Sequence, residues 1–283
     1  MEILHTVKET RELVRAWRIN GERIGLVPTM GFLHEGHFSL MRRAKRENDR
    51  VVTSIFVNPI QFGPKEDFAS YPRDMEADSA ACRHEAVDLI FAPTVEEMYP
   101  VGFCSYIDMD KITAGLCGKS RPGHFRGVCT VVAKLFNIVT PDKAYFGQKD
   151  AQQVAVIQRM TRDLSMGLEI VSCPTVRESD GLAKSSRNAY LSAEERKAAL
   201  AVSRAVFKGE KLVKEKGERD AGRLIAAMRE TLAAEPLAKV DYIEVVGAES
   251  MEKVDRIDGS TLVALAVFIG KTRLLDNFVC HTA

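Results

Sequence analysis

The sequence contains little that would indicate a metal protein, a secreted protein or a membrane protein. Its six cysteines are widely scattered and no two form a Cys-x-x-Cys pair, so we expect mostly buried thiols and not a zinc site or a redox pair. No apolar run approaches the roughly 18 residues of a membrane span, and residues 1–5 lack the layout of a signal peptide. These absences predict a cytoplasmic protein with no membrane segment.

An excess of charge of either sign is also missing. The 283 residues include 40 Lys and Arg against 39 Asp and Glu, and the net charge of +1 provides no overall attraction to nucleic acid or membrane. A hydrophobic content of 46% is ordinary for a globular chain with a substantial core, and the length suits one large domain or two smaller ones.

The most informative stretch is a glycine-bearing loop between an apolar segment, residues 24–27, and a segment of helical composition, residues 38–45. Pro28 cannot donate a hydrogen bond to a sheet, so the strand is expected to end there. Gly31 and Gly36 permit tight turns before the helix.

Two histidines, His34 and His37, stand where this helix is expected to begin. A helix N-terminus offers unpaired N–H groups and partial positive charge, which suit a phosphate. Histidines three residues apart can both donate to one phosphoryl oxygen. Two solvated histidines at a helix start would produce the same pattern.

Further along the chain, apolar strands alternate with helices, which indicates a Rossmann-like, doubly wound parallel sheet in an α/β domain spanning residues 1–176. Its later strands are expected at residues 50–57, 87–92, 144–146 and 168–171. Two helices follow, with an alternating strand at residues 240–246 and two further strands at residues 262–269 and 274–280. They predict a smaller C-terminal α+β domain with an antiparallel sheet, residues 177–283.

Polar side chains occur just beyond the ends of several expected strands. Asn58 and Gln61 follow the second strand, where open parallel sheets place ligand contacts, and amides can fix a hydroxyl and a carboxylate. Loop-capping amides are the alternative. His124 lies at an expected helix start and is either a ligand or a structural histidine.

A second set of candidates follows residue 147. Lys149 can reach a phosphate as a point charge, Asp150 can cap a helix or hold a ribose hydroxyl, and Gln153 would face the same site one turn later. A solvated Lys–Asp pair is the alternative. The long polar connection over residues 174–188 has hydroxyls and cations that suit a triphosphate. Residues 177–190, with many polar side chains and Gly181, have little apolar area, which predicts a loop that is mobile without nucleotide and ordered with it.

Five motifs together resemble the pantoate–β-alanine ligase (pantothenate synthetase) family of the nucleotidyltransferase superfamily. The frame Pro-Thr-Met-Gly-x-Leu-His-Glu-Gly-His, residues 28–37, resembles the superfamily's HIGH signature. Residues 54–62, 121–135 and 146–153 follow in the family's order as Ser-Ile-Phe-Val-Asn-Pro-x-Gln-Phe, Arg-Pro-x-His-Phe-x-Gly-Val-x-Thr-Val-Val-x-Lys-Leu and Phe-Gly-x-Lys-Asp-x-Gln-Gln. The fifth motif, residues 184–187, reads Lys-Ser-Ser-Arg, where the family usually has Leu or Met before Ser-Ser-Arg.

The resemblance covers nearly the whole chain and implies an ATP-dependent ligase that joins pantoate to β-alanine through a pantoyl adenylate, with Mg²⁺ accompanying ATP and no dedicated metal site. It also implies a homodimer. The implied catalytic residues are His34, His37, Lys149 and Arg187, and the implied pantoate and β-alanine ligands are Asn58, Gln61, His124 and Gln153. The implied ATP-binding residues are Met30, Gly31, Phe32, Leu33, His34, Glu35, Gly36, His37, Gly147, Gln148, Lys149, Asp150, Val176, Lys184, Ser185, Ser186 and Arg187.

Two other classes of function compete with this interpretation. One is a nucleotidyltransferase that stops at adenylyl or cytidylyl transfer, but such enzymes are shorter and lack the Asn58, Gln61 and Gln153 elements. The other is a non-catalytic nucleotide-binding or RNA-binding module related to tRNA synthetases, which the near-neutral charge disfavours.

Overall fold

The computed structural model describes residues 1–64 and 66–281, which form two compact units. The first unit comprises Met1–Met109, Arg121–Gln148 and Val156–Pro174. The second comprises Asp110–Ser120, Lys149–Ala155 and Thr175–Ala283. A functional division of the chain between residues 176 and 177 stays a prediction.

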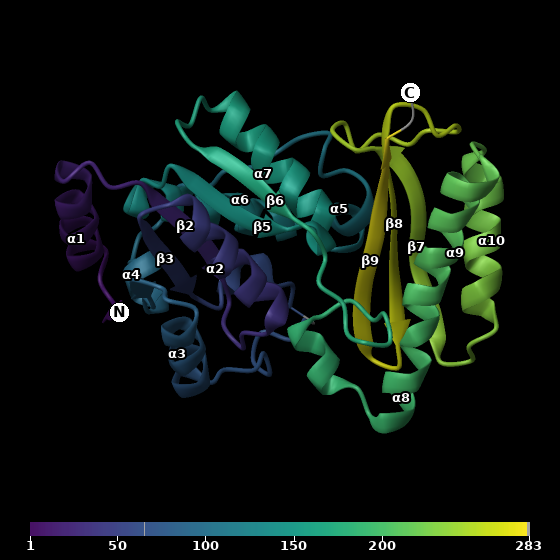
Figure 1. Ribbon diagram of the computed structural model, residues 1–283, viewed down its shortest axis with the longest axis horizontal. Helices are drawn as coiled ribbons and strands as arrows, with labels where there is room; N and C mark the ends of the chain where they lie inside the picture. The colour runs from purple at the N-terminus through teal and green to yellow at the C-terminus, as the bar shows by residue number, and fades with distance from the viewer. Residues whose placement is uncertain (65, 282–283) are drawn as a thin grey trace. The chain divides into compact units, whose positions relative to one another are not determined.

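The first unit contains a six-stranded, fully parallel sheet with the strand order β1-β4-β3-β2-β5-β6, which confirms the expected doubly wound fold. Figure 1 labels β3, β2, β5 and β6 of this sheet. The strands are β1 (Glu2–Leu4), β2 (Ile24–Thr29), β3 (Arg50–Ile55), β4 (Leu89–Phe91), β5 (Lys143–Gly147) and β6 (Glu169–Cys173). The connecting helices are α1 (Val7–Ile19), α2 (Glu35–Glu47), α3 (Met75–His84), α4 (Val95–Met98) and α6 (His124–Val139), with a 3-10 turn η1 (Pro59–Gln61).

Both faces of this sheet are covered. Val27 and Val51 lie in one buried cluster with Met41 of α2, which packs against β2, β3 and β5. Their strand neighbours Leu26 and Val52 are also fully buried. Because successive strand residues point to opposite faces, the apolar runs of these strands record burial on both sides.

The expected end of the first strand at Pro28 was wrong, because β2 continues to Thr29 and Pro28 pairs with Ser54 in the β3 register. The Thr29 carbonyl accepts from the Phe56 N–H on the β3 side, at 3.1 Å, so the backbone of Pro28 faces the opposite side. There, β5 pairs with β2 only at Gly25 and Leu26. The missing N–H of Pro28 therefore interrupts no ladder.

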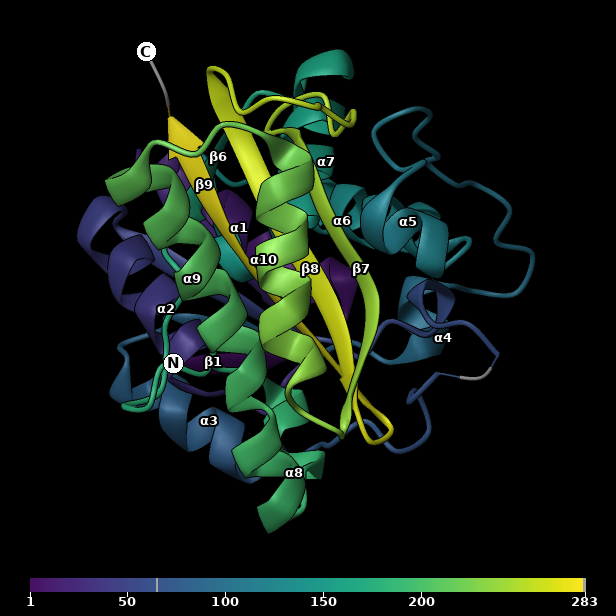
Figure 2. The same cartoon turned by 90° about the vertical axis from the view of Figure 1, so that its right-hand side faces the viewer.

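The second unit is built on a three-stranded antiparallel sheet of β7 (Ala238–Gly247), β8 (Ser260–Ile269) and β9 (Thr272–His281), as expected. Helices α9 (Leu200–Lys216) and α10 (Ala221–Ala233) cover one face of it (Figure 2). The remaining elements include the helices α5 (Leu116–Ser120) and α8 (Ala193–Ala198) and the 3-10 turn η3 (Ser186–Tyr190). The 3-10 turn η2 (Gln148–Asp150) and helix α7 (Ala151–Asp163) each contain residues of both units.

No helix within the described residues has the length and apolar character needed to span a bilayer. Within the same residues, no group of three or more His, Cys, Asp or Glu side chains is arranged to hold a metal ion.

Candidate active site

His34 and His37 cap the start of α2 reciprocally. His34 is the N-cap residue, and its Nδ1 accepts from the Gly36 N–H at 3.1 Å, while Nδ1 of His37 accepts from the His34 N–H at 3.3 Å. The ring centroids lie 4.1 Å apart. Because a backbone N–H can only donate, each neutral ring carries its proton on Nε2. The sequence therefore folds into a helix start with two imidazole Nε2–H donors side by side.

The loop before α2 is held by a buried carboxylate that the sequence analysis did not find. Asp78 of α3 is 3% exposed and accepts from the N–H groups of Phe32 and Leu33 at 2.8 and 2.7 Å. Burial raises the pKa of Asp78 despite these two bonds, which act to lower it. Nothing in the spacing of residues 74–86 distinguishes Asp78 from a solvated helix residue.

The two glycines of this loop serve different purposes. Gly31 has a φ of +82°, and a Cβ there would lie 2.8 Å from Oδ2 of Asp78. Gly36 was expected to form a tight turn, but this was wrong. It lies in the first turn of α2 and its φ is not positive. A Cβ at Gly36 would lie 2.8 Å from Cε1 of His34, so this glycine makes room for the imidazole.

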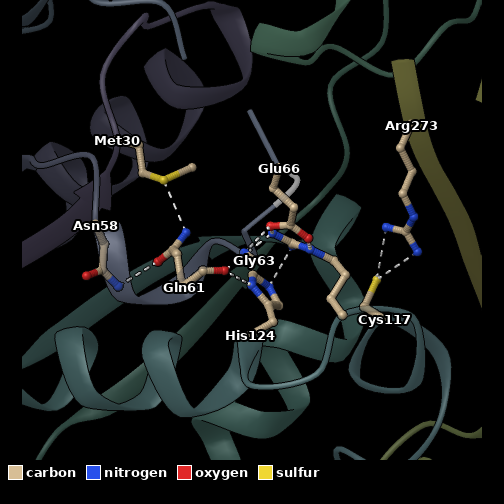
Figure 3. A network of polar contacts seen from close by, with 9 residues as sticks. Met30, Asn58, Gln61, Gly63, Glu66, Cys117, His124 and Arg273 are labelled. Atoms are coloured by element: carbon tan, nitrogen blue, oxygen red, sulfur yellow. Dashed lines mark hydrogen bonds and ion pairs between the residues drawn. The ribbon is translucent and has the colours of Figure 1, made fainter. Parts of the chain in front are cut away.

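Asn58 and Gln61 lie together in a buried amide network at the end of β3 (Figure 3). Nδ2 of Asn58 donates to Oε1 of Gln61 at 3.0 Å and to the Gly127 carbonyl at 3.1 Å. The Tyr99 hydroxyl donates to Oδ1 of Asn58 at 2.7 Å, and Nε2 of Gln61 lies 3.1 Å from the Met30 sulfur. The structure therefore brings the two amides together with Met30 of the loop that precedes α2, residues 30–34, which we call the histidine loop.

His124 supports the backbone of Gln61. Its Nδ1 donates to the Gln61 carbonyl and its Nε2 accepts from Arg121, both at 2.9 Å, so the ring is neutral (Figure 3). Arg121 in turn binds both carboxylate oxygens of Glu66 at 2.6 Å. Burial acts to raise the pKa of Glu66, but the Arg121 ion pair outweighs it and lowers that pKa to about 2. A direct contact of His124 with substrate stays a prediction.

Lys149, the expected cation, is the first residue of the Lys149–Ala155 segment of the second unit. The Lys149 side chain is 19% exposed and its Nζ lies 3.5 Å from Oδ2 of Asp150. Its backbone carbonyl accepts from Nδ2 of Asn277 in β9 at 2.9 Å. Gln153 is half-buried in the first turn of α7. In the first unit, Gln148 after Gly147 accepts from the Ser172 hydroxyl at 2.6 Å.

The connection after residue 174 is more structured than its composition suggested. Arg177 and Ala183 form an antiparallel bridge, and Arg196 binds Glu178 and Asp180 at 3.0 and 2.8 Å. Leu182 and Ala183 are buried at 2% and 4% exposure. The expectation of a polar loop with little buried apolar area was therefore wrong. Its mobility without nucleotide stays a prediction.

The residues of the Lys-Ser-Ser-Arg motif follow this bridge. The Lys184 N–H donates to the Val176 carbonyl at 2.9 Å. Ser185 is the N-cap residue of η3 and its hydroxyl accepts from the Arg187 N–H at 3.3 Å. Ser186 is buried, and Lys184 and Arg187 are half-buried. The motif is thus a strand-like step followed by a capped 3-10 turn.

An open parallel sheet with a capped, histidine-bearing helix start after its second strand defines a Rossmann-like α/β protein. The family model described as pantoate-beta-alanine ligase matches residues 2–279. The chain belongs to the pantoate–β-alanine ligase family.

Individual relatives agree with this assignment. The pantothenate synthetase of Pelotomaculum thermopropionicum is 57% identical over 279 residues, 99% of each chain, and that of Ruminiclostridium cellulolyticum is 55% identical over 98% of each. The crystal structure of pantothenate synthetase from Thermus thermophilus has a TM-score of 0.93 at 46% identity, covering 98% of this chain and 99% of that one. A Francisella tularensis pantoate-beta-alanine ligase, complexed with "Beta-gamma ATP and Beta-alanine", has a TM-score of 0.81 at 36% identity, covering 99% and 97%.

Proposed function

We propose that this chain joins pantoate to β-alanine with ATP, giving pantothenate, AMP and pyrophosphate. The observation that carries the proposal is the family match over residues 2–279, in a chain whose His34 and His37 cap α2 side by side. A carboxylate is a poor acyl donor, so the reaction needs an activated intermediate. In the first step a pantoate carboxylate oxygen attacks the α-phosphorus of ATP, and pyrophosphate leaves with the bonding electrons.

The developing charge on the phosphoryl oxygens is stabilised by donors that the fold holds in place. His34 and His37 offer Nε2–H groups at the positive end of the α2 dipole, and Lys149 and Arg187 act as the cations. The remaining ATP contacts are assigned to the segments that the resemblance implies: residues 30–37, 147–150, Val176 and 184–187. Preorganised donors of this kind act mainly on the transition state.

Pantoate is assigned to the amides of Gln61, Asn58 and Gln153. The bond between Asn58 and Gln61 orients both amides, and the His124–Gln61 contact fixes the main chain beneath them. In the second step the amine of β-alanine attacks the acyl carbon of pantoyl adenylate, and AMP leaves. The amine proton passes to solvent or to the departing phosphate, so no covalent enzyme intermediate is required.

Mg²⁺ is assigned to the substrate as MgATP, with phosphate oxygens and water as its ligands. A homodimer and a cytoplasmic location also remain proposals. Functionally, residues 1–176 would bind pantoate and part of the nucleotide, and residues 177–283 would supply the Lys-Ser-Ser-Arg motif.

A single assay tests the proposed reaction against its competitors. AMP release should require both pantoate and β-alanine, while pantoate alone should support exchange of labelled pyrophosphate into ATP. A nucleotidyltransferase that stops at adenylyl transfer would turn over without β-alanine. Such an enzyme would release pyrophosphate but no AMP, whereas release of neither product under any combination would favour a binding module. Either outcome would overturn the proposal.

A further inference from the structure

Two neighbouring polar residues of β9 reach two segments that are far apart in the chain. The carboxylate of Asp276 binds Arg177 through both oxygens, at 2.7 and 2.8 Å. The next residue, Asn277, donates from Nδ2 to the Lys149 carbonyl at 2.9 Å. Both side chains are buried, with residue exposures of 2% and 6%.

We infer that Asp276 and Asn277 are positioning residues that fix Lys149 and the segment 177–187 against one rigid strand. The inference rests on the proposed function, in which Lys149 and Arg187 act on the phosphates of ATP. Asp276 and Asn277 are not assigned any contact with substrate.

The strand is a suitable anchor because it pairs along its whole length with β8. Asp276 and Asn277 stand opposite Leu265 and Ala264 in an unbroken register. Successive strand side chains point to opposite faces. Asp276 therefore lies on the face of Leu274 and Phe278, which α9 covers, and Asn277 lies on the other face. One backbone thus controls two segments on its two sides.

Arg177 connects Asp276 of β9 to the segment of residues 177–187. Besides Asp276, it donates to the Gly181 carbonyl at 3.1 Å and lies 4.8 Å from the ring centroid of Phe207 in α9. The Arg177–Ala183 bridge then sets the register from which Lys184 starts the Lys-Ser-Ser-Arg motif. A planar guanidinium held by two carboxylate bonds fixes direction as well as distance.

The first test replaces the carboxylate with an amide. In the full-length protein, Asp276→Asn should lower kcat/KM for ATP by about tenfold to a hundredfold, because misplaced phosphate donors weaken the transition state. The KM for β-alanine should change less than about twofold. Hydrogen exchange of residues 177–187 should become faster. Asn277→Ala should reduce kcat/KM for ATP in the same direction by a smaller factor, of about three to ten.

The matched control is another ion pair of the same unit. Arg273 binds Asp241 at 2.7 and 3.0 Å and also contacts the Cys117 sulfur (Figure 3), but neither residue of the pair bonds to Lys149 or Arg177. Asp241→Asn should lower thermal stability while leaving the ATP kcat/KM within about twofold of wild type.

Replacing the Arg177–Asp276 pair by apolar side chains distinguishes a purely structural role from a positioning role. Exchanging a buried ion pair for apolar side chains often restores stability. Arg177→Met with Asp276→Leu should therefore recover thermal stability while the ATP defect persists. Arg177→Lys, which keeps the charge and loses the two-point geometry, provides a milder variant if Asp276→Asn does not fold. Wild-type ATP kcat/KM and wild-type exchange in the folded variants would overturn the inference.

Failure of the proposed function can be distinguished from failure of the positioning role, because the two are tested by different measurements. If the wild-type chain does not release AMP with pantoate and β-alanine, that proposal falls. The exchange rates of residues 177–187 in Asp276→Asn still decide whether the pair positions the segment. Unchanged exchange in both Asp276→Asn and Arg177→Lys would overturn the positioning role in that case too.

Discussion

The two units hold their candidate functional groups by different means. In the first unit the main chain does most of the holding: His34 and His37 accept from backbone N–H groups, Asp78 accepts from two more, and His124 donates to a carbonyl. In the second unit the segment after residue 176 is held largely by ion pairs, from Arg177 to Asp276 and from Arg196 to Glu178 and Asp180.

This difference has a physical consequence. Hydrogen bonds to the main chain fix the loop conformation itself and are little affected by salt. Ion pairs fix where a loop is attached, and partly exposed pairs weaken with ionic strength. The histidine loop is therefore expected to be preorganised, whereas the Lys-Ser-Ser-Arg segment is expected to respond more to salt, pH and nucleotide.

The largest expected effect is at the preorganised histidine. His37→Ala should slow pantoate-dependent pyrophosphate exchange by at least tenfold and up to about a thousandfold, because a donor aimed at developing charge is lost. The fold should remain intact by circular dichroism. His84 is a solvent-exposed histidine of the same unit, and His84→Ala should retain full activity. A folded His37→Ala enzyme at full speed would remove this residue from the mechanism.

The next effect tests whether the main chain holds the histidine loop. Asp78→Asn has the right size but presents one donor to the Phe32 and Leu33 N–H groups. It should lower the free energy of unfolding by about 1–3 kcal/mol. Pyrophosphate exchange should also slow, by about tenfold. Asp74 caps the same helix, and Asp74→Asn should change little because asparagine is an equally good cap.

The pH dependence of Asp78 follows from the raised pKa. A carboxyl whose pKa is higher in the folded state contributes stability that is complete below its unfolded pKa. That contribution declines as pH rises through the folded pKa. The wild type should therefore lose stability through this group as pH rises through that pKa, and Asp78→Asn, which cannot titrate at this position, should lack that dependence. A wild type that gains stability relative to Asp78→Asn as pH rises would contradict this account.

Gln61 tests the substrate assignment within the first unit. Gln61→Ala should weaken pantoate binding by about tenfold, as expected for a lost hydrogen bond of up to about 1.5 kcal/mol. ATP binding, measured by calorimetry on the same preparation, should change less than about twofold. Equal weakening of both ligands would mean that the amide network supports the whole site and does not select pantoate.

Glu66 provides a further test of the comparison between the two units. It forms an ion pair with Arg121 in the first unit, where main-chain hydrogen bonds hold most of the candidate functional groups. Its pKa is lowered to about 2 from 4.5, so its contribution is present above about pH 4.5 and is lost as pH falls towards 2. Discounted for partial exposure, the contribution is about 1–2 kcal/mol. Glu66→Gln should show this loss at neutral pH and a flatter acid dependence. Urea unfolding between pH 2 and 7 measures both.

The sequence predicted the elements of the fold better than the contacts between them. Alternating strands and helices were sufficient for the parallel sheet, and the residues around Gly36 were sufficient to place the start of α2. Asp78 was missed because its partners lie 45 and 46 residues away in the sequence, and the spacing of apolar residues along the chain does not indicate such distant contacts.

One missed residue did leave a signal. Asp276 occupies the same face of its strand as Leu274, Phe278 and Cys280, all buried in one cluster. A carboxylate in such an alternation must be buried and paired, although the pattern could not show that its partner is Arg177. The apolar content of Leu182 and Ala183 was likewise visible, but their burial depends on the surrounding second unit.

The smallest expected effect concerns Lys184, where the motif departs from the family pattern. Its side chain either adds a contact to the β- or γ-phosphate or lays its aliphatic stem where the usual Leu or Met would pack, with the ammonium in water. We favour the second, because the bond from its N–H to Val176 fixes the main chain whatever the side chain, and Lys149 and Arg187 are already assigned to the phosphates. An exposed ion pair contributes only about 0–1 kcal/mol. Lys184→Met should therefore change the KM for ATP less than about fivefold and hardly alter the salt dependence of ATP binding. A fall of a hundredfold or more in kcat/KM for ATP would instead make Lys184 a phosphate ligand, and the second unit would then supply one cation more than the family pattern requires.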